Sequence, residues 1–229
     1  MPDIANLRQR SIRRLLTTLL TLACLLVLAA GTRRFWQAWL LLGLMTAFWT
    51  FFLINFLKHD RQLLERRLQH RETEPEQRRF QKLFPLILLL AFLVPGLDFR
   101  FGWSRALLPV PLVVMAFGQV MTVAGYCLVF WVMKTNTFAA STIQVETGQN
   151  VIDRGPYALV RHPMYLGMAM TALGIPLALA SSVAFPVFAL LLPLLVYRLI
   201  HEECALRRNL PGYSEYCERT RRRLLPWFW

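Results

Sequence analysis

Acidic residues are scarce in this chain of 229 residues: 13 Asp and Glu stand against 26 Lys and Arg, which gives a formal net charge of +13 at pH 7. Such a surplus is often found in proteins that bind nucleic acid, but here the basic residues cluster in tails and loops beside long apolar runs. In that position they face anionic lipid and fix membrane topology. The charge pattern therefore argues against nucleic acid as a partner and favours a membrane.

Cysteine is too sparse and too scattered to build a metal site or a disulfide framework. The four cysteines show no C-x-x-C spacing, and Cys24 and Cys127 lie inside apolar runs. Zinc centres and disulfide-rich domains depend on regularly spaced cysteines. We therefore expect no metal centre. No internal repeat or low-complexity tract stands out either.

Charge is nearly absent from two long stretches, residues 15–30 and 107–133, and neither alternates apolar with polar residues. Over the whole chain, 56% of the residues are hydrophobic. A helix needs about 20 apolar residues to cross a hydrocarbon core of about 30 Å, whereas a half-buried strand alternates with a period of two. The sequence therefore predicts an all-α fold, a polytopic transmembrane helical bundle of five to six spans with a C-terminal helical hairpin.

The expected spans are residues 12–30, 35–57, 83–97 and 106–133, followed by two hairpin arms within residues 164–200. No small-residue cleavage site follows the first run, so that span is expected to stay in place. Residues 98–105 form an outer loop. Pro109 and Pro111 allow the fourth span to tilt or to begin as a broken interfacial piece. Each hairpin arm has about seventeen residues, just enough to cross the membrane.

The segment between the second and third spans, residues 58–82, is rich in Lys and Arg with leucines interspersed. Because positive charge marks the cytoplasmic side, we place this segment, residues 134–163 and both termini in the cytoplasm. The leucine spacing favours a helix lying on the headgroups, and a solvated charged linker fits equally well. With no organelle signal, the basic loops favour a bacterial inner membrane, and an internal eukaryotic membrane is the alternative.

Ionisable and backbone-shaping residues gather at the mouth of the predicted hairpin. Residues 155–167 precede and begin its first arm, and residues 198–203 end its second arm. A hairpin brings its two ends to one membrane face, so these stretches become neighbours, with residues 144–157 folded over them. Because ionisable residues near the membrane interior are costly and mark functional sites, the sequence predicts a cytoplasmic pocket at this point.

Single members of this group also have purely structural explanations. His162-Pro163 is a favourable helix start, because Pro suits the first helical turn and its predecessor avoids the helical region. Arg161 can be a positive-inside anchor, and Tyr157 and Tyr165 can be interfacial aromatics.

The end of the second arm has a structural explanation as well. Arg198 lies one helical turn before Glu202, so the two can form an i,i+4 ion pair. Carboxylates are unfavourable at a helix C-terminus, so Glu202 and Glu203 need cationic partners. None of these explanations accounts for the convergence of the whole group on one membrane face, which favours a functional site.

Several ordered motifs carry a family resemblance: Gly155-Pro156-Tyr157, residues 160–167, Arg198 with Glu202-Glu203, residues 213–216, and Leu225-Pro226. Together they resemble the C-terminal signature of the isoprenylcysteine carboxyl methyltransferase family, whose wider group includes phospholipid N-methyltransferases. Residues 63–77 are also similar to bacterial members. The chain departs from human-type members in having Gln149-Asn150 where they have His-Thr, and in a one-residue gap before Tyr213. The choice between Glu202 and Glu203 as the cofactor contact therefore stays open.

The resemblance implies an integral membrane enzyme that moves a methyl group from S-adenosylmethionine to a lipophilic acceptor, most like the carboxylate of an isoprenylcysteine, without a soluble Rossmann-type domain. Residue by residue, it implies a cofactor site of Gln144, Gln149, Asn150, Val151, Ile152, Tyr157, His162, Pro163, Met164, Tyr165, Glu202 and Glu203. It implies Arg198 and His162 as catalytic residues, with Arg198 also binding the substrate. Residues 1–82 would then be N-terminal helices with the charged segment, and residues 83–229 the methyltransferase core.

The residue types suit this chemistry. Displacement at a sulfonium needs positioning and exclusion of water, and no metal or covalent nucleophile. Glu202 can hold an ammonium group, and Tyr157 or Tyr165 can pack on adenine. A carboxylate acceptor is already ionised and can be held bidentately by Arg198. An amine or phenol acceptor needs a base, for which His162 or a glutamate is available.

Other functions stay open at this point. A phospholipid or another small molecule could accept the methyl group on nitrogen, oxygen or sulfur. An NADPH-dependent membrane reductase of the sterol-reductase type has a similar C-terminal cofactor region. A transporter would bury charge within its spans, whereas here the polar groups lie at span ends. Membrane lipids and a lipophilic substrate are the expected partners, and the sequence carries no signal for oligomeric state.

Overall fold

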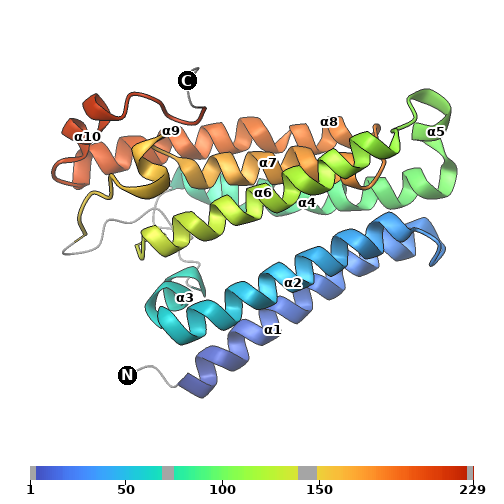
Figure 1. The fold of residues 1–229 in the computed structure, drawn as a ribbon, viewed down its shortest axis with the longest axis horizontal. Helices are drawn as coiled ribbons and strands as arrows, with labels where there is room; N and C mark the ends of the chain where they lie inside the picture. The colour runs from blue at the N-terminus through green and yellow to red at the C-terminus, as the bar shows by residue number, and fades with distance from the viewer. Residues whose placement is uncertain (1–3, 69–74, 139–148, 226–228) are drawn as a thin grey trace.

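A computed structural model describes residues 4–68, 75–138, 149–225 and 229 of the chain. Within these residues the secondary structure is helical and contains no strand. The long helices lie side by side, alternating in direction, and the short elements gather at the two ends of the bundle (Figure 1). The predicted all-α bundle is confirmed.

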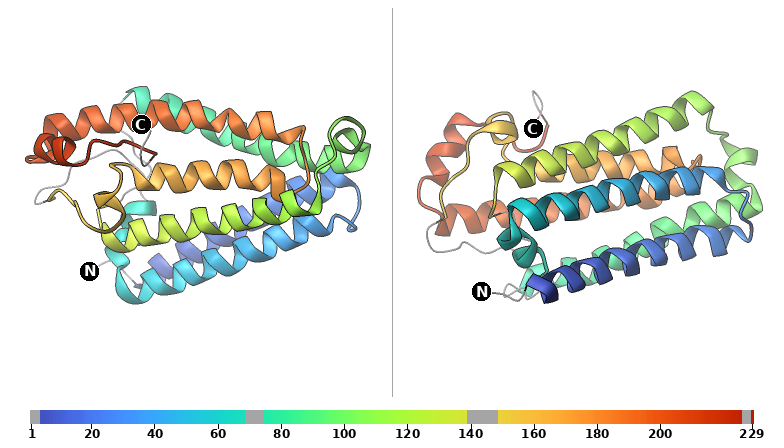
Figure 2. Two further views of the ribbon diagram at one scale, coloured as in Figure 1. Left: turned by 45° about the horizontal axis from the view of Figure 1, so that its top comes forward. Right: turned by 60° about the horizontal axis from the view of Figure 1, so that its bottom comes forward.

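The elements follow one another along the chain as α1 (Ile4–Ala23), η1 (Cys24–Leu28), α2 (Trp36–His59), α3 (Arg61–Leu68), α4 (Pro75–Phe101), α5 (Trp103–Leu107), α6 (Leu112–Thr135), η2 (Gly155–Ala158), α7 (Pro163–Ala178), α8 (Ala184–Ala189), α9 (Leu191–Asn209) and α10 (Tyr213–Arg219). Both views in Figure 2 place α3, η2 and α10 at one end of the bundle and α5 at the other. We call the first of these the site end.

Five helical segments of the described chain are long and apolar enough to cross a membrane: Ala5–Leu28, Trp36–His59, Lys82–Phe101, Leu112–Thr135 and Ala184–Asn209. Their outer surfaces carry exposed leucines and valines, such as Leu28 and Val113, as expected of side chains that face lipid. Helix α7 has 16 residues and lies beside α6. The five apolar helices identify an integral membrane protein, and they match the lower predicted number of spans.

The predicted outer loop at residues 98–105 is wrong in its first half. Helix α4 continues to Phe101, with Pro85 and Pro95 inside it, and the turn comes at Gly102, whose φ is +73°. The reason is the Asp98 carboxylate, which is only 4% exposed. It accepts hydrogen bonds from the Ser104 backbone N–H at 2.7 Å and from the Ser104 and Ser181 hydroxyls at 2.5 Å each. A carboxylate with three donors is satisfied inside the bundle and does not require a solvated loop.

The two alternatives for the fourth span and the predicted hairpin are also resolved. The helix is broken at residues 108–111, so α5 is a separate short helix and α6 is the candidate span. The hairpin arms are unequal, contrary to prediction: the first ends at Ala178, whereas the second continues to Asn209. The extra turns of α9 are stabilised by packing, because Leu206 packs against buried side chains of α10.

The charged segment after α2 is not a solvated linker over residues 61–68. These residues form α3, in which Leu63 is fully buried against Phe56 and Met133. Arg66 reaches across the site end and donates a hydrogen bond to the Thr137 carbonyl at 2.8 Å. Helix α3 therefore lies against the end of α6 and is part of the fold.

Helices α6 and α7 approach each other more closely than residues with a Cβ would permit at the positions of contact. Gly125 faces Gly167, and Gly118 faces Gly174, one pair for each end of the contact. A Cβ on Gly125 would lie 2.5 Å from Thr171 Oγ1 and 2.6 Å from the Gly167 carbonyl oxygen. Small residues are what lets helix backbones approach within a membrane, where apolar side chains gain nothing by leaving lipid. This contact fixes the start of α7 relative to the rest of the bundle.

We expect Gly125→Ala to destabilise the protein by about 1–3 kcal/mol, the usual cost of overpacking, and to lower its melting temperature in detergent. Gly43→Ala is the matched control, because nothing lies within 4 Å of a Cβ at Gly43 in α2. Equal melting temperatures for the two variants would contradict the close approach of α6 and α7.

Candidate functional site

A cavity of about 260 Å³ lies at the site end, enclosed by α3, the start of α4, the chain after α6, η2, the start of α7, α9 and α10. Its volume is slightly below the roughly 300–1,000 Å³ that is usual for ligand pockets. Its lining combines charged and phenolic residues with aromatic and aliphatic side chains. The cavity is therefore suited to an amphiphile or to two ligands of different polarity.

The structure brings most of the sequence-predicted site residues to this cavity. Those that line it are Gln149, Asn150, Val151, Ile152, Tyr157, His162, Pro163, Met164, Tyr165, Arg198 and Glu202. Gln144 lies outside the described residues, and Glu203 is not among the lining residues. The hairpin closes the long sequence gap between the two motifs, as expected.

The sequence prediction missed about half of the cavity wall. The additional lining residues are Arg67, Phe80, Phe84, Asn136, Phe138, Arg161, Met168, Leu206, Leu210, Tyr213 and Tyr216. Arg161, Tyr213 and Tyr216 belong to the recognised motifs and could have been included. Arg67, Phe80 and Phe84 had no local signal, because they reach the cavity only through the packing of α3 and α4.

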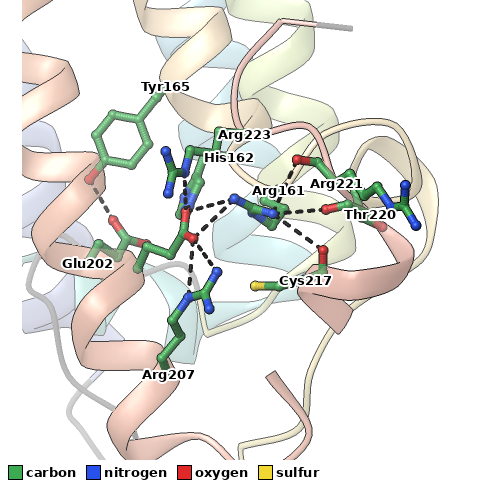
Figure 3. Close-up of polar contacts among 10 residues, drawn as sticks. Arg161, His162, Tyr165, Glu202, Arg207, Cys217, Thr220, Arg221 and Arg223 are labelled. Carbon is green, nitrogen blue, oxygen red and sulfur yellow. Dashed lines mark hydrogen bonds and ion pairs between the residues drawn. The ribbon is translucent and has the colours of Figure 1, made fainter. Parts of the chain in front are cut away.

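Glu203 is buried at the centre of an ion-pair cluster. The side chains of Arg161, Arg207 and Arg223 converge there (Figure 3). Its carboxylate lies 3.1 Å from Arg161 Nη2, 2.9 Å from Arg207 Nη2 and 3.1 Å from Arg223 Nε. His162 Nε2 lies 3.4 Å from the same carboxylate. The side chain of Glu203 is 4% exposed, so this charge is compensated by the arginines around it and not by water.

Arg161 ties the C-terminal tail to the start of α7. The Arg161 backbone N–H donates to the Arg222 carbonyl at 2.9 Å, and the His162 N–H donates to the Arg223 carbonyl at 2.9 Å. The Arg161 guanidinium adds hydrogen bonds to the Thr220 and Arg221 carbonyls at 3.2 and 3.3 Å (Figure 3). Since Arg161 is only 7% exposed, its interpretation as a positive-inside anchor is wrong.

Glu202, the neighbour of Glu203, lines the cavity. The Tyr165 hydroxyl donates a hydrogen bond of 2.5 Å to Glu202 Oε2. The Tyr165 ring is buried and meets the His162 ring edge to face, with 5.9 Å between their centroids. Tyr165 is therefore not an interfacial aromatic. It positions one oxygen of a carboxylate in the cavity.

Three aromatic residues with polar groups complete this side of the cavity. Asn136 Nδ2 donates to the Tyr157 hydroxyl at 3.0 Å, and the Tyr216 hydroxyl donates to the Tyr157 carbonyl at 2.7 Å. Burial raises the pKa of Tyr157 to about 12, and the nearby Glu202 adds to the rise. The Tyr213 hydroxyl is buried and has no hydrogen-bond partner among the described residues. Burial raises the pKa of Tyr213 above its usual value, as it does for Tyr157. Protonated phenols can donate to a ligand.

Besides Arg161, the cavity is lined by Arg67 of α3 and Arg198 of α9. The Arg198 guanidinium carbon lies 4.7 Å from the centre of the Phe80 ring, in cation–π geometry. Arg67 Nη2 lies 3.0 Å from Met164 Sδ. Burial lowers the pKa of Arg67 to about 10, which still leaves it protonated at neutral pH.

Comparison with known proteins gives partial matches. The model of the phospholipid methyltransferase family matches residues 113–210. Delta(14)-sterol reductase TM7SF2 of Mus musculus is 35% identical over 89 residues, which cover 38% of this chain and 21% of the reductase. The chain thus spans about a fifth of the length of this relative.

The family match runs from α6 to the end of α9 and includes η2, both hairpin arms and the two adjacent glutamates. It supports a membrane methyltransferase. Arg67, Phe80 and Phe84 lie outside the matched residues, as do Tyr213 and Tyr216. The cavity is therefore built from a matched part and an unmatched part.

Replacing Glu203 with Gln should destabilise the protein, because it leaves Arg161, Arg207 and Arg223 around an uncharged side chain. Breaking a buried ion pair costs about 3–5 kcal/mol, so we expect a clear fall in melting temperature in detergent. Glu218→Gln is the control, since Glu218 is exposed on α10. If both variants have the same melting temperature as the unchanged protein, the cluster does not stabilise the fold.

Proposed function

We propose that this chain is an integral membrane methyltransferase that moves the methyl group of S-adenosylmethionine to a lipophilic acceptor. The observation that carries the proposal is the cavity at the site end, where Glu202, His162 and residues 149–152 meet within the part of the chain that the phospholipid methyltransferase model matches. The cavity lies at the end of apolar helices, so a water-soluble cofactor and a lipid can both reach it.

The residues present fit this cofactor. Its ammonium group needs an anion, and the Glu202 carboxylate is held in the cavity by Tyr165. Its carboxylate and ribose need donors, which His162, the backbone of residues 149–152 and the unpaired Tyr213 hydroxyl can supply. An aromatic face for adenine is available on Tyr157.

The remaining predicted cofactor residues have narrower roles in this proposal. Pro163 and Met164 form the wall of the cavity at the first turn of α7. Glu203 supports the site through Arg161 and His162 and does not contact the cofactor. Gln144 stays a prediction.

When bound, S-adenosylmethionine supplies an electrophilic methyl group on a sulfonium. The protein contributes position and exclusion of water, because no proton has to be moved when the acceptor is already ionised. Arg198 would orient such an acceptor through two parallel hydrogen bonds. An amine acceptor would instead have to lose a proton, for which His162 is the available base.

Charge favours an anionic acceptor, most like the carboxylate of an isoprenylcysteine. Arg161 is paired with Glu203 beside the cavity, whereas Arg198 lines the cavity itself. A guanidinium can hold a carboxylate through two parallel hydrogen bonds. A zwitterionic cofactor with a sulfonium brings one net positive charge, so an acceptor with a negative charge suits this site better than an amine.

Orientation follows from the same end of the bundle. Arg207, Arg208, Arg219, Arg221 and Arg222 are exposed and flank the cavity in sequence. Because basic residues mark the cytoplasmic side, we propose that the site and both termini face the cytoplasm, in a bacterial inner membrane.

A second candidate function is an NADPH-dependent membrane reductase. It is favoured by the partial identity with the Delta(14)-sterol reductase. The arginines that line the cavity could bind the 2′-phosphate of NADPH.

Calorimetric titration of the detergent-purified protein separates the two candidates. We expect saturable binding of S-adenosylhomocysteine, because it keeps the ammonium, carboxylate and adenine groups, and no binding of NADPH. Binding of NADPH alone would move the chain to the reductases, and binding of neither would remove both candidates.

Variants of the cavity should separate cofactor binding from acceptor binding. Glu202→Gln and His162→Ala should each weaken S-adenosylhomocysteine binding by at least tenfold, since a hydrogen bond to a charged group contributes about 1.5–3 kcal/mol. Arg198→Gln should leave that affinity unchanged and lower methylation of a farnesylated cysteine. Glu215→Gln, on the exposed face of α10, is the control. Unchanged affinity in both Glu202 and His162 variants would contradict the assignment.

A further inference from the structure

We propose that the end of the bundle opposite the site end binds the phosphate of an anionic phospholipid through four arginines. These are Arg33 and Arg34, in the turn between η1 and α2, together with Arg100 at the end of α4 and Arg105 in α5. We call them the far-end arginines. The inference does not depend on the proposed methyltransferase function, because none of the four is among the described residues that line the cavity.

The first argument is that two turns distant in the sequence bring these arginines together. Phe35 stacks on Phe99, with 4.4 Å between the ring centroids, and so joins the beginning of α2 to the end of α4. A Cβ on Gly31 would lie 3.7 Å from Arg100 Nε, so the Arg100 side chain lies against the turn between η1 and α2. Figure 2 shows this turn beside α5 in both views.

The second argument is that both turns are held in place by side chains. The Trp39 indole N–H donates a hydrogen bond to the Arg33 carbonyl at 2.9 Å. The Asp98 carboxylate accepts one from the Ser104 backbone N–H at 2.7 Å, which fixes the turn between α4 and α5. A phosphate would therefore meet positive charges that stand on an ordered backbone. Binding to a pre-organised surface loses less affinity to ordering of the protein.

The third argument is that no carboxylate compensates the charge of these arginines. Arg100 and Arg105 lie over aromatic rings, with their guanidinium carbons 5.5 Å from the centre of Phe101 and 5.0 Å from the centre of Phe99. None of the ion pairs within the described residues involves a far-end arginine. The nearby Asp98 is buried and is satisfied by serines. The surface can therefore attract an anion.

The fourth argument comes from topology. Basic residues in short connections usually mark one face of a membrane protein. Here the site end carries the larger number of arginines, among them Arg207, Arg208 and Arg219, yet four others stand at the opposite end. Their charge works against the tendency that sets topology, which indicates a binding partner of their own. An anionic lipid fits better than a zwitterionic one, whose ammonium group would lie beside arginines.

The fifth argument is what surrounds the far-end arginines. Trp36, Trp39 and Trp103 are exposed on the same elements, and tryptophans concentrate at the depth of lipid headgroups. Leu108 and Val113, which are 66% and 80% exposed, follow where the chain enters α6 and can contact acyl chains. A phosphate bound at this depth is thus attached to a lipid. A second copy of this chain would bring four further arginines and would be repelled.

The test is native mass spectrometry of the detergent-purified protein, which measures the fraction that carries a bound lipid. The ligands are phosphatidylglycerol, phosphatidylcholine of the same chain length, and glycerol phosphate as a headgroup without acyl chains. Each half of the surface is removed in turn, by Arg33→Gln with Arg34→Gln and by Arg100→Gln with Arg105→Gln. The matched control is Arg154→Gln with Arg208→Gln, which removes two exposed charges at the site end.

We expect the unchanged protein to bind phosphatidylglycerol more tightly than phosphatidylcholine or glycerol phosphate. Because a basic residue near an anionic lipid surface contributes about fivefold in affinity, each far-end variant should weaken phosphatidylglycerol binding by at least about tenfold. The control variant should weaken it far less. Melting temperatures without lipid check the fold. The Arg33 and Arg34 variant stays informative if loss of the ring contacts of Arg100 and Arg105 destabilises the other one.

Four results would overturn the inference. The first two are unchanged phosphatidylglycerol binding in both far-end variants, and phosphatidylcholine binding as tight as that of phosphatidylglycerol. Glycerol phosphate binding as tightly as the lipid would make this surface a site for soluble anions. An equal loss of affinity in the control variant would show that only the overall charge attracts the lipid. Because S-adenosylhomocysteine is absent from the experiment, none of these outcomes bears on the proposed methyltransferase function.

Discussion

The burial of one carboxylate, that of Glu203, holds the site end of this protein together. A buried carboxylate without partners is costly. Three arginines and His162 offset this cost at Glu203. Because these partners come from the start of α7, from α9 and from the C-terminal tail, satisfying one charge also fixes three segments of chain. The tail then covers the start of α7 through backbone hydrogen bonds to Arg161 and His162.

Glu202 and Glu203 are neighbours with different surroundings. Successive residues on a helix point about 100° apart, so adjacent side chains of α9 cannot both face the ion-pair cluster. Glu203 meets the cluster, and Glu202 meets the cavity and the Tyr165 hydroxyl. The sequence left the choice between them open, because a one-residue gap in the resemblance exchanges their positions. The rotation of α9 favours Glu202 as the residue available to a ligand.

The sequence predicted well the features that local patterns determine. These are the long apolar helices, the break at Pro109 and Pro111, and the hairpin that brings His162 and Arg198 to one cavity. What it missed depends on contacts between distant segments. The sequence predicts a loop from Asp98 onward, whereas hydrogen bonds from Ser104 and Ser181 satisfy the Asp98 carboxylate inside the bundle. Residues 61–68 are mostly charged, so the sequence alone did not show that Leu63 of α3 is buried against other helices.

If the acceptor is a carboxylate, the proposed role of Arg198 would also affect how the product leaves. Methylation would remove the negative charge of the acceptor, so the product would lose its attraction to Arg198 once the reaction is complete, while its apolar chain would stay compatible with lipid. An interaction that is strong for the substrate and weak for the product avoids trapping the product in the site. An amine acceptor would instead keep or gain positive charge beside this arginine. Under the proposed function, one guanidinium would therefore favour both selection of an anionic acceptor and release of the neutral product into the membrane.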